Sequence, residues 1–600
     1  MFDNIMKKLE EECCMEKYIL DKVNEWLGEE YDEKTKAEIK KLLDENNEEE
    51  LIDRFYKDLE FGTGGLRGKI GAGTNRMNIY NIRKATQGVA NCIHKYFKNS
   101  PSAIVTYDCR NFSREFAMET ASVLAGNGIK VYITKDMRPT PYLSFAIREL
   151  KTSAGIIITA SHNPPEYNGY KVSWNDGGQV VPPIDKEIIA EVGKISSLSQ
   201  IKKMDFEEGL KKGLICYVPE ELDEKFINVA LSQILNKDVI EKQKENIKIA
   251  YTPLHGVGIT VIPELMRKLG IKNFFMVKEQ AKPDGNFPTV RFPNPEEDEA
   301  MKMVLELAKE KDADIAIATD PDADRVRFAA KTKNGNYRLF SGNQILTMLI
   351  YYKLFTLKNK GMDFSNKFII KTIVTTDIIK RIAKEFGVKL YEVLTGFKWI
   401  AAKIKEKEEK GEEYLIGGEE SIGYLVGPYC RDKDSVGAIA LITELACYLK
   451  ENDKTFMDFL EEIYSKFDFY LESLVSIVRE GKEGEEKIKS FMSAMKSKPL
   501  AKLGKRNLVK VMDVEDGIIY EYPSKNVIEK LNLPKSKVLG FFYDDGSKIM
   551  LRPSGTEPKV KFYLSVNLKC DDNIEKIEKK GGDKLKKLQE DFVKIVKKLL

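Results

Sequence analysis

A short apolar run that leads into a polar turn is the feature that most constrains the fold of this chain. Residues 154–159 read Ala-Gly-Ile-Ile-Ile-Thr, a composition typical of a strand buried inside a parallel sheet. The turn that follows contains a serine, a histidine and two prolines, so the strand ends there. Open α/β sheets bind their ligands at the carboxyl ends of such strands. The pattern therefore predicts an α/β fold with a site at Ser161.

The Ser161 hydroxyl does not by itself identify an enzyme. A serine is a poor nucleophile until a base, a metal or a prior covalent modification activates it. A Ser-His-Asn-Pro turn whose side chains only satisfy backbone groups explains the segment equally well. The choice between these readings depends on the rest of the chain.

A second strand-to-loop transition supplies acidic groups. The alternating run at residues 313–319 leads into Asp320-Pro-Asp322-Ala-Asp324-Arg325. Three carboxylates at alternate positions of a bent loop can converge on one hard cation, and a set of oxygen ligands favours Mg²⁺ or Ca²⁺ over zinc. An EF-hand is excluded, because its sixth and twelfth positions are Arg325 and Lys331 rather than glycine and glutamate. We predict a magnesium loop, with a solvated acidic turn as the alternative.

Two more loops carry groups suited to a phosphorylated sugar. Residues 552–556 read Arg-Pro-Ser-Gly-Thr between two apolar runs, and their guanidinium, hydroxyls and accessible backbone N–H groups suit a phosphate dianion. This loop lacks the glycine spacing of a P-loop, and a turn with a structural arginine is the alternative. Residues 417–421 read Gly-Gly-Glu-Glu-Ser, a set that suits sugar hydroxyls but also occurs in surface turns.

The four loops together resemble those of the α-D-phosphohexomutases, the phosphoglucomutase and phosphomannomutase family. The likeness runs from about residue 50 to the C-terminus and keeps the family's loop order. Residues 61–68, which contain Arg67, resemble the family's glycine-rich entry segment, and residues 395–398 resemble its third-domain substrate loop. The resemblance implies an α/β protein of four domains around a central cleft: three similar mixed α/β domains and a distinct C-terminal α+β domain.

Domain boundaries follow from the positions of these loops. Six hundred residues fit about four domains at ~150 residues each. The basic amphipathic tail at residues 583–600 is expected to cover the last domain's sheet. The expected segments are an N-terminal helical extension (1–58), domain I with the phosphoserine loop (59–205), domain II with the metal loop (206–335), domain III with the sugar loop (336–455) and domain IV with the phosphate loop (456–600).

The resemblance also implies a mechanism and a set of site residues. Ser161 would carry a phosphoryl group, and one Mg²⁺ per chain would be held by Asp320, Asp322, Asp324 and the phosphate on Ser161. Transfer to a sugar monophosphate would form glucose 1,6-bisphosphate, which also serves as the activator, and the other phosphate would then return to the serine. His162 and Lys171 are the candidates for proton transfer, and Arg67 and Arg325 would steady the moving group. The substrate would be bound by Thr395, Gly396, Lys398, Glu419, Ser421, Arg552, Ser554, Gly555 and Thr556.

The sugar is the least determined part of this prediction. Residues 422–424 read Ile-Gly-Tyr where many relatives have a histidine, which resembles the longer subfamily of bacterial α-phosphoglucomutases and vertebrate phosphopentomutases. We predict the interconversion of α-D-glucose 1-phosphate and glucose 6-phosphate, with pentose and mannose phosphates as alternatives. From other functional classes, a magnesium-dependent phosphohydrolase and a non-catalytic sugar-phosphate sensor stay open.

Composition limits the classes of binding partner and the cellular location expected for this chain. The chain has 97 basic and 94 acidic residues, and a net charge of +3 does not indicate nucleic acid. Its eight cysteines form no CxxC pair, which indicates reduced thiols and a cytoplasmic protein. No apolar run approaches the ~20 residues that span a bilayer. The expected partners are small-molecule sugar phosphates, without membrane or nucleic acid, and the choice between monomer and dimer stays open.

Overall fold

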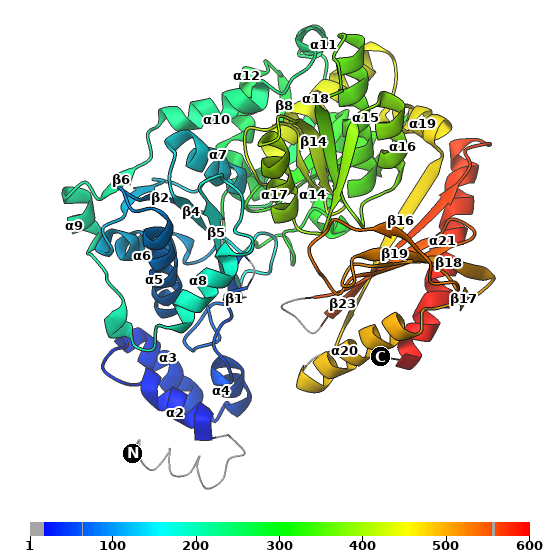
Figure 1. The fold of residues 1–600 in the computed structure, drawn as a ribbon. Coiled ribbons are helices and arrows are strands. Elements are labelled where there is room, and N and C mark those ends of the chain that lie inside the picture. The colour runs from blue at the N-terminus through cyan, green and yellow to red at the C-terminus, as the bar shows by residue number, and fades with distance from the viewer. Residues whose placement is uncertain (1–16, 63, 480, 555–558, 600) are drawn as a thin grey trace. The chain divides into compact units, whose positions relative to one another are not determined.

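The computed structural model describes residues 17–62, 64–479, 481–554 and 559–599 (Figure 1). The start of the N-terminal extension and the predicted phosphate-binding residues Gly555 and Thr556 lie outside these ranges. Within them, no helix combines the length and apolar character needed to cross a membrane. The chain forms two compact units. The first contains residues 1–234, 240–329 and 425–443, and the second contains residues 235–239, 330–424 and 444–600.

Three helices open the first unit: α2 (Lys17–Trp26), α3 (Glu33–Asp44) and α4 (Glu48–Phe55). The side chain of Asp32 caps α3 by accepting a hydrogen bond from the Thr35 amide. The buried faces of the three helices share one apolar core with Tyr80 of the next helix. The Trp26 ring lies 4.6 Å from Tyr31 and 5.6 Å from Tyr80, measured between ring centroids. This core joins the N-terminal helices to the α/β part of the unit.

The first sheet has the order β1-β5-β4-β2-β3-β6. Strands β4, β2, β3 and β6 run parallel to one another. Strand β5 is antiparallel to β4, and β1 is antiparallel to β5. Every residue of β4 is buried, as its run of β-branched residues predicts. The strands are β1 (Gly65–Lys69), β2 (Ser102–Tyr107), β3 (Lys130–Ile133), β4 (Ala154–Ile158), β5 (Tyr167–Trp174) and β6 (Ile215–Tyr217).

Helices cover this sheet (Figure 1). Buried side chains of α5 and α6 share one core with Val105 of β2 and Ile156 of β4. Helix α7 packs so closely on β4 that a Cβ added to Gly155 would lie 2.5 Å from Ile147. The helices are α5 (Ile79–Tyr96), α6 (Ser113–Gly126), α7 (Thr140–Leu150), α8 (Ile184–Gly193), α9 (Phe206–Lys211) and α10 (Glu221–Leu231), with a short turn η1 (Leu198–Gln200).

The second sheet has the order β11-β10-β9-β7-β8, and β8, β7 and β9 are parallel. Strand β9 ends directly before the three predicted metal ligands. Its strands are β7 (Lys248–Thr252), β8 (Asn273–Met276), β9 (Ile315–Thr319), β10 (Val326–Lys331) and β11 (Tyr337–Leu339). The associated helices are α11 (Lys237–Gln243), α12 (Ile262–Lys268), α13 (Lys278–Ala281) and α14 (Asp298–Lys311), with the turn η2 (Val257–Thr260).

The second unit begins with a sheet of order β13-β12-β14-β15, in which β12 is parallel to both β13 and β14. Its strands are β12 (Lys367–Thr372), β13 (Lys389–Val393), β14 (Glu413–Glu419) and β15 (Gly423–Leu425). The helices of this part of the chain are α15 (Gly342–Asn359), α16 (Ile378–Phe386), α17 (Phe397–Glu408), α18 (Ser435–Glu451) and α19 (Phe456–Phe467).

The last sheet is largely antiparallel, with the order β16-β23-β22-β21-β18-β19-β20 and β17 beside β18. Leu588 and Phe592 of α21 pack into its core, so the C-terminal helix covers this sheet as predicted, although it begins nine residues earlier at Ile574. The elements are β16 (Phe469–Val478), α20 (Gly481–Ser497), β17 (Lys502–Leu503), β18 (Arg506–Asp513), β19 (Ile518–Glu521), β20 (Val527–Lys530), β21 (Leu539–Tyr543), β22 (Lys548–Pro553), β23 (Lys559–Leu568) and α21 (Ile574–Leu599).

Candidate active site

Ser161 lies on a sharply bent turn beyond the carboxyl end of β4. We call residues 159–166 the serine turn. The Ser161 backbone has a φ of +52°, in the left-handed region, and its amide donates a hydrogen bond of 2.8 Å to the Thr159 hydroxyl. The Ser161 Oγ donates to Asp320 Oδ2 at 2.8 Å and lies 3.2 Å from His162 Nδ1. The turn thus aims the hydroxyl at the acidic loop that the sequence predicted as its neighbour.

The carboxylate loop, residues 320–325, follows β9. Asp320, Asp322 and Asp324 are each at most 1% exposed, and one oxygen from each lies within 4.8 Å of the others. The backbone bends at Ala323, whose φ is +49°, and the amides of Asp324 and Arg325 donate to Asp320 Oδ1. The alternate spacing read from the sequence therefore brings three carboxylates to one point.

The electrostatics of this cluster favour a bound cation. Burial and the neighbouring carboxylates raise the pKa of Asp320 well above its ordinary value. Burial also acts to raise the pKa of Asp322, but the Lys171 charge and the Thr140 hydroxyl lower it instead. The Oδ1 atoms of Asp322 and Asp324 are buried and accept no hydrogen bond from any residue the structure describes. Buried carboxylate oxygens without donors fit a hard divalent cation.

Two lysines partly balance the cluster. Lys171 Nζ lies 3.0 Å from Asp322 Oδ2 and 3.9 Å from Asp324 Oδ2. Lys433 Nζ lies 3.1 Å from Asp324 Oδ2. Lys433 was not predicted as a site residue. Its signal in the sequence is the charged run at residues 431–434, which follows the sugar loop. The structure assigns residues 425–443 to the first unit, together with the carboxylate loop.

The remaining predicted catalytic residues also belong to this neighbourhood. Arg67 on β1 donates to Asn163 Oδ1 in the serine turn at 3.1 Å. Arg325 Nε lies 3.8 Å from Asp324 Oδ1, and its guanidinium donates to Glu296 at 3.1 Å. Burial and the nearby Arg325 and Arg67 charges hold the pKa of His162 well below its ordinary value. A neutral imidazole can accept a proton, which suits a group beside a reacting hydroxyl.

His255, unlike His162, is engaged in the protein interior. The sequence contains three histidines, and this one lies outside the serine turn. It is 2% exposed, and its ring nitrogens contact the Lys282 carbonyl oxygen at 3.2 Å and the Thr289 hydroxyl at 2.8 Å. Both ring nitrogens are therefore engaged by the protein itself.

The predicted sugar-binding residues belong to the second unit. Glu419 at the end of β14 accepts a hydrogen bond of 2.7 Å from the Gly396 amide, at the entry to α17. Gly396 has a φ of +110°, which strains any residue with a side chain, so glycine is required at this junction. The Thr395–Gly396 loop and the sugar loop are thus joined. Lys398 Nζ lies 5.1 Å from the ring centroid of Trp399. The substrate-binding role of Ser421, like that of the other residues of this set, stays a prediction.

Only part of the phosphate loop is described. Arg552 is near the end of β22, and the Ser554 amide donates to the Lys559 carbonyl at 2.7 Å, which closes the base of the loop. Burial together with the charge of Glu420 raises the pKa of Tyr563 on β23, while the nearby Arg552 charge acts to lower it. Within the second unit, the Tyr563 hydroxyl is therefore within electrostatic reach of both Arg552 and Glu420.

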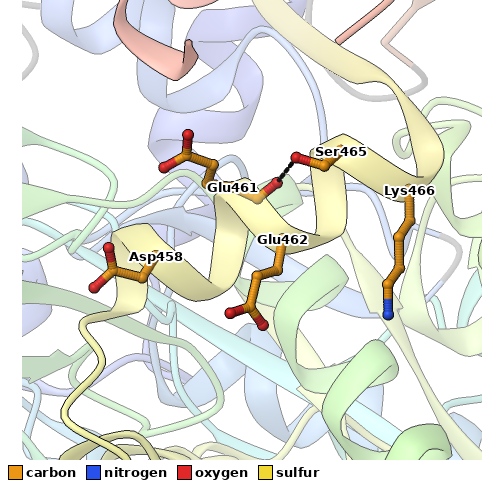
Figure 2. Close-up of a pocket in the computed structure, with 5 residues that line it drawn as sticks. All are labelled: Asp458, Glu461, Glu462, Ser465 and Lys466. Carbon is orange, nitrogen blue, oxygen red and sulfur yellow. Dashed lines mark hydrogen bonds between the residues drawn. The ribbon is translucent and has the colours of Figure 1, made fainter. Parts of the chain in front are cut away.

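A separate surface pocket lies along one helix (Figure 2). Its lining residues all come from α19, and Ser465 Oγ donates to the Glu461 carbonyl at 2.8 Å. Thr455 caps this helix by accepting a hydrogen bond from the Asp458 amide, and the Asp458 carboxylate pairs with Lys333 at 2.6 Å. The pocket contains none of the predicted site residues, so it does not compete with the serine turn as the reactive centre. It is lined by Asp458, Glu461, Glu462, Ser465 and Lys466.

Three models of the phosphoglucomutase/phosphomannomutase family match the chain. They describe α/β/α domain I at residues 58–199, domain II at residues 224–335 and domain III at residues 341–467. The fold predicted from the sequence, three such domains and a further sheet-rich C-terminal domain, is confirmed.

Individual relatives extend this likeness along the chain. A phosphoglucomutase of Staphylococcus saprophyticus is 35% identical over 537 residues, which cover 89% of this chain and 95% of that protein. One from Staphylococcus haemolyticus is 37% identical over 528 residues and covers 87% and 92% of the two chains. Two solved structures share the fold. pp63/parafusin (phosphoglucomutase) from Paramecium has a TM-score of 0.64 at 18% identity and covers 89% and 96% of the two chains. A phosphoglucomutase/phosphomannomutase family protein from Burkholderia thailandensis has a TM-score of 0.62 at 18% identity and covers 90% and 97%.

Proposed function

The chain belongs to the phosphoglucomutase/phosphomannomutase family, and we propose that it is an isomerase that interconverts α-D-glucose 1-phosphate and glucose 6-phosphate. The observation that carries this proposal is the hydrogen bond from Ser161 Oγ to Asp320 in a buried cluster of three carboxylates. A hydroxyl at a cation-binding cluster is the arrangement that phosphoryl transfer requires. The hexose follows the names of the relatives that match most of this chain.

The cation proposed for the cluster is Mg²⁺, held by Asp320, Asp322, Asp324 and the phosphorylated side chain of Ser161. The all-oxygen donor set fits this ion. When bound, Mg²⁺ neutralises the charge that accumulates on a transferring phosphoryl group.

The residues of the serine turn would conduct the transfer in two steps. In the first, a hydroxyl of the sugar monophosphate attacks the phosphorus of phosphorylated Ser161, the bond from phosphorus to Oγ breaks, and the hydroxyl proton passes to a base. His162 and Lys171 are the candidate bases, since both lie at the site. In the second, after the sugar has turned over, Ser161 Oγ attacks the other phosphoryl group of the bisphosphate and the bond from that phosphorus to its sugar oxygen breaks. The sugar oxygen takes up the proton held by the base, and the isomeric monophosphate leaves.

Other residues would bind and orient the substrate. Arg67 and Arg325 would place donors on the moving phosphoryl group, because a guanidinium offers a fixed fork to phosphate oxygens. In the second unit, the sugar and phosphate loops would bind the part of the substrate that does not react in that step. The residues proposed for this are Thr395, Gly396, Lys398, Glu419, Ser421, Arg552, Ser554, Gly555 and Thr556.

The setting proposed for the reaction is the cytoplasm, with sugar phosphates as the only partners required. Support comes from the cysteines, since the six in the described residues are all free thiols. Glucose 1,6-bisphosphate is the proposed activator, because it can restore the phosphorylated state of Ser161 when the intermediate is lost.

The proposal is tested by incubating the protein with Mg²⁺ and a trace of glucose 1,6-bisphosphate. Glucose 1-phosphate, mannose 1-phosphate and ribose 1-phosphate are offered separately, and isomer and inorganic phosphate are measured together. Fast isomerisation of glucose 1-phosphate without phosphate release is expected. Preference for ribose or mannose would correct the sugar. Phosphate release matching substrate loss would indicate a hydrolase, and binding without turnover would indicate a sensor.

A further inference from the structure

A second loop reaches the serine turn from the neighbouring strand. Strands β2 and β4 are parallel, with Tyr107 opposite Ile158, so both chains emerge at the same edge of the sheet. The Asp108 amide donates to the Ile158 carbonyl at 3.1 Å and extends this pairing by one residue. Arg110 is the second residue beyond that point. None of these residues was predicted from the sequence to take part in the site.

The Arg110 guanidinium makes four hydrogen bonds to the backbone of this region. Its Nη1 donates to the carbonyl oxygens of Pro164 at 2.8 Å and of Tyr167 at 3.0 Å. Its Nη2 donates to the carbonyl oxygen of Ser161 at 2.6 Å and also to that of Asn163. One rigid planar group thus binds three carbonyls of the serine turn and that of Tyr167, the first residue of β5.

The guanidinium is itself held from its other sides. Arg110 is 3% exposed, and its guanidinium carbon lies 4.9 Å from the centroid of the Phe287 ring. The Asp108 carboxylate is 3.6 Å from Arg110 Nε and accepts a 2.9 Å hydrogen bond from the Arg110 amide. Asp108 also accepts a bond of 2.7 Å from Ser113 at the start of α6. A buried charge pair of this kind keeps its geometry because water cannot replace its partners.

The serine turn needs such support. A non-glycine residue at positive φ costs about 1–2 kcal/mol relative to ordinary backbone, and Ser161 has a φ of +52°. Strained backbone at a functional site persists only where surrounding contacts determine it. Arg110 donates a hydrogen bond to the carbonyl oxygen of Ser161 itself. This contact holds the Ser161 backbone and so sets the direction of the Ser161 side chain toward Asp320.

We propose that Arg110 is a positioning residue for phosphoryl transfer, which fixes the strained backbone of the serine turn so that Ser161 Oγ stays in line with the reacting phosphorus. This inference rests on the proposed function. Arg110 does not touch the reacting atoms, since the four hydrogen bonds of its guanidinium end on backbone carbonyl oxygens. Its loss should therefore slow both transfers at Ser161 while leaving sugar-phosphate binding in the second unit intact.

The test compares Arg110→Lys with Arg76→Lys. Arg76 is a matched control, since it is 2% exposed and donates to backbone carbonyls and to the Asp53 carboxylate, but makes no bond to the serine turn. Lysine keeps the charge at position 110 but cannot span four carbonyls with one ammonium group. Thermal unfolding, kcat, KM for glucose 1-phosphate and the single-turnover rate of Ser161 phosphorylation by glucose 1,6-bisphosphate are measured for each protein.

For Arg110→Lys, kcat and the phosphorylation rate should fall about 10²-fold, the cost of a misplaced reacting group, with KM changed by less than about twofold. Arg76→Lys should lose a similar amount of thermal stability and keep both rates. Unchanged rates in Arg110→Lys, or equal rate losses in the two variants, would overturn the inference alone. Failure of the unsubstituted protein to phosphorylate Ser161 would instead overturn the proposed function, and this inference with it.

A second variant covers the case in which Arg110→Lys does not fold. Asp108→Asn keeps the shape of the side chain and removes the negative charge that faces Arg110 Nε. The same split, a lower phosphorylation rate with an unchanged KM, is expected at about tenfold. A folded Asp108→Asn protein with the original phosphorylation rate would count against the positioning role.

Discussion

At the scale of single residues, the candidate site depends on a few charge pairs of opposite sign. Asp322 contacts Lys171 and Asp324 contacts Lys433, while Ser161 donates to Asp320. Each pair is buried, so its interaction is only weakly screened by solvent. The chemistry assigned to these residues can therefore be tested by substitutions that change one group and leave the packing in place.

Replacement of Ser161 by alanine should abolish isomerisation, with a loss of at least about a thousandfold, because the hydroxyl proposed to carry the phosphoryl group is removed. Binding of glucose 6-phosphate, measured by calorimetry, should change little. Ser173→Ala is the control, since Ser173 is a buried serine on β5 of the same sheet. Full turnover by the Ser161→Ala protein would refute the phosphoserine mechanism.

At the scale of elements, helices and strands far apart in the chain are joined by local features that the sequence does not display. The N-terminal helices bind the rest of the first unit through an aromatic core and through Arg54, which pairs with Glu38 and Glu50 and donates to the Ala72 carbonyl. In the second unit, β16 contacts α15 through the bond from Asn343 to Glu472. Both junctions give measurable predictions.

Trp26→Ala should lower the free energy of unfolding of the N-terminal helices by about 3–5 kcal/mol, the usual cost of removing a buried tryptophan. Trp26 is 3% exposed and stacks on Tyr31 at 4.6 Å. Limited proteolysis should then cleave within α2 to α4 earlier than in the unsubstituted protein. Tyr18→Ala, at a position 48% exposed on the same helix, should leave cleavage unchanged. Equal protection of the Trp26→Ala protein would contradict this account of the core.

Glu472 should make stability depend on pH. Burial raises the pKa of Glu472 to about 7, against the nearby Thr376 hydroxyl and the charge of Lys548, which act to lower it. The folded state therefore binds the proton more tightly than the unfolded state, whose glutamate titrates near 4.3. Stability from this group is full below about pH 4 and is lost as pH rises through about 7, by at most ~4 kcal/mol.

Urea unfolding at pH 5 and pH 8 measures this effect. In Glu472→Gln the difference between the two pH values should shrink, because the amide does not titrate. Glu413→Gln is the control, because Glu413 pairs with Lys367 at 2.6 Å with a side chain 62% exposed. A Glu472→Gln protein that keeps the whole pH difference would show that another group is responsible.

At the scale of the whole molecule, the chain crosses repeatedly between its two units. Residues 425–443 return to the first unit after the sugar loop has been formed in the second. This excursion brings Lys433 to Asp324, and the Ser435 hydroxyl donates to the Ala323 carbonyl at 2.5 Å. The cation site thus joins three stretches of sequence that are far apart: the serine turn, the carboxylate loop and the start of α18.

Mg²⁺ should consequently raise the unfolding temperature. A ligand at a hundredfold excess over its dissociation constant stabilises the folded state by about 2.7 kcal/mol. The shift should be lost on addition of EDTA and greatly reduced in Asp322→Asn, whose carboxylate is part of the cluster. Glu461→Gln removes an acidic group of the α19 pocket and should keep the whole shift. A full Mg²⁺ shift in Asp322→Asn would place the ion elsewhere.

Strong local patterns were readable from the sequence. The buried strands β4 and β9 and the polar loops after them follow from runs of β-branched and small apolar residues that end abruptly. The convergence of Asp320, Asp322 and Asp324 follows from alternate spacing on a bent loop. The apolar face of the C-terminal helix predicted its contact with the last sheet. These features depend on neighbours within about ten residues, so a single sequence contains them.

The sequence by itself determined the α/β class, the four loops and the residue types for phosphoryl transfer, because those are properties of short segments. Only the tertiary structure decided that Lys433 belongs to the carboxylate cluster and that Arg110 clamps the serine turn. Arg110 and Ser161 are 51 residues apart, and Asp324 and Lys433 are 109 apart. Contacts at such separations depend on which strands become neighbours in a sheet and where the chain re-enters a unit. The packing of the whole chain sets both, and no local pattern records them.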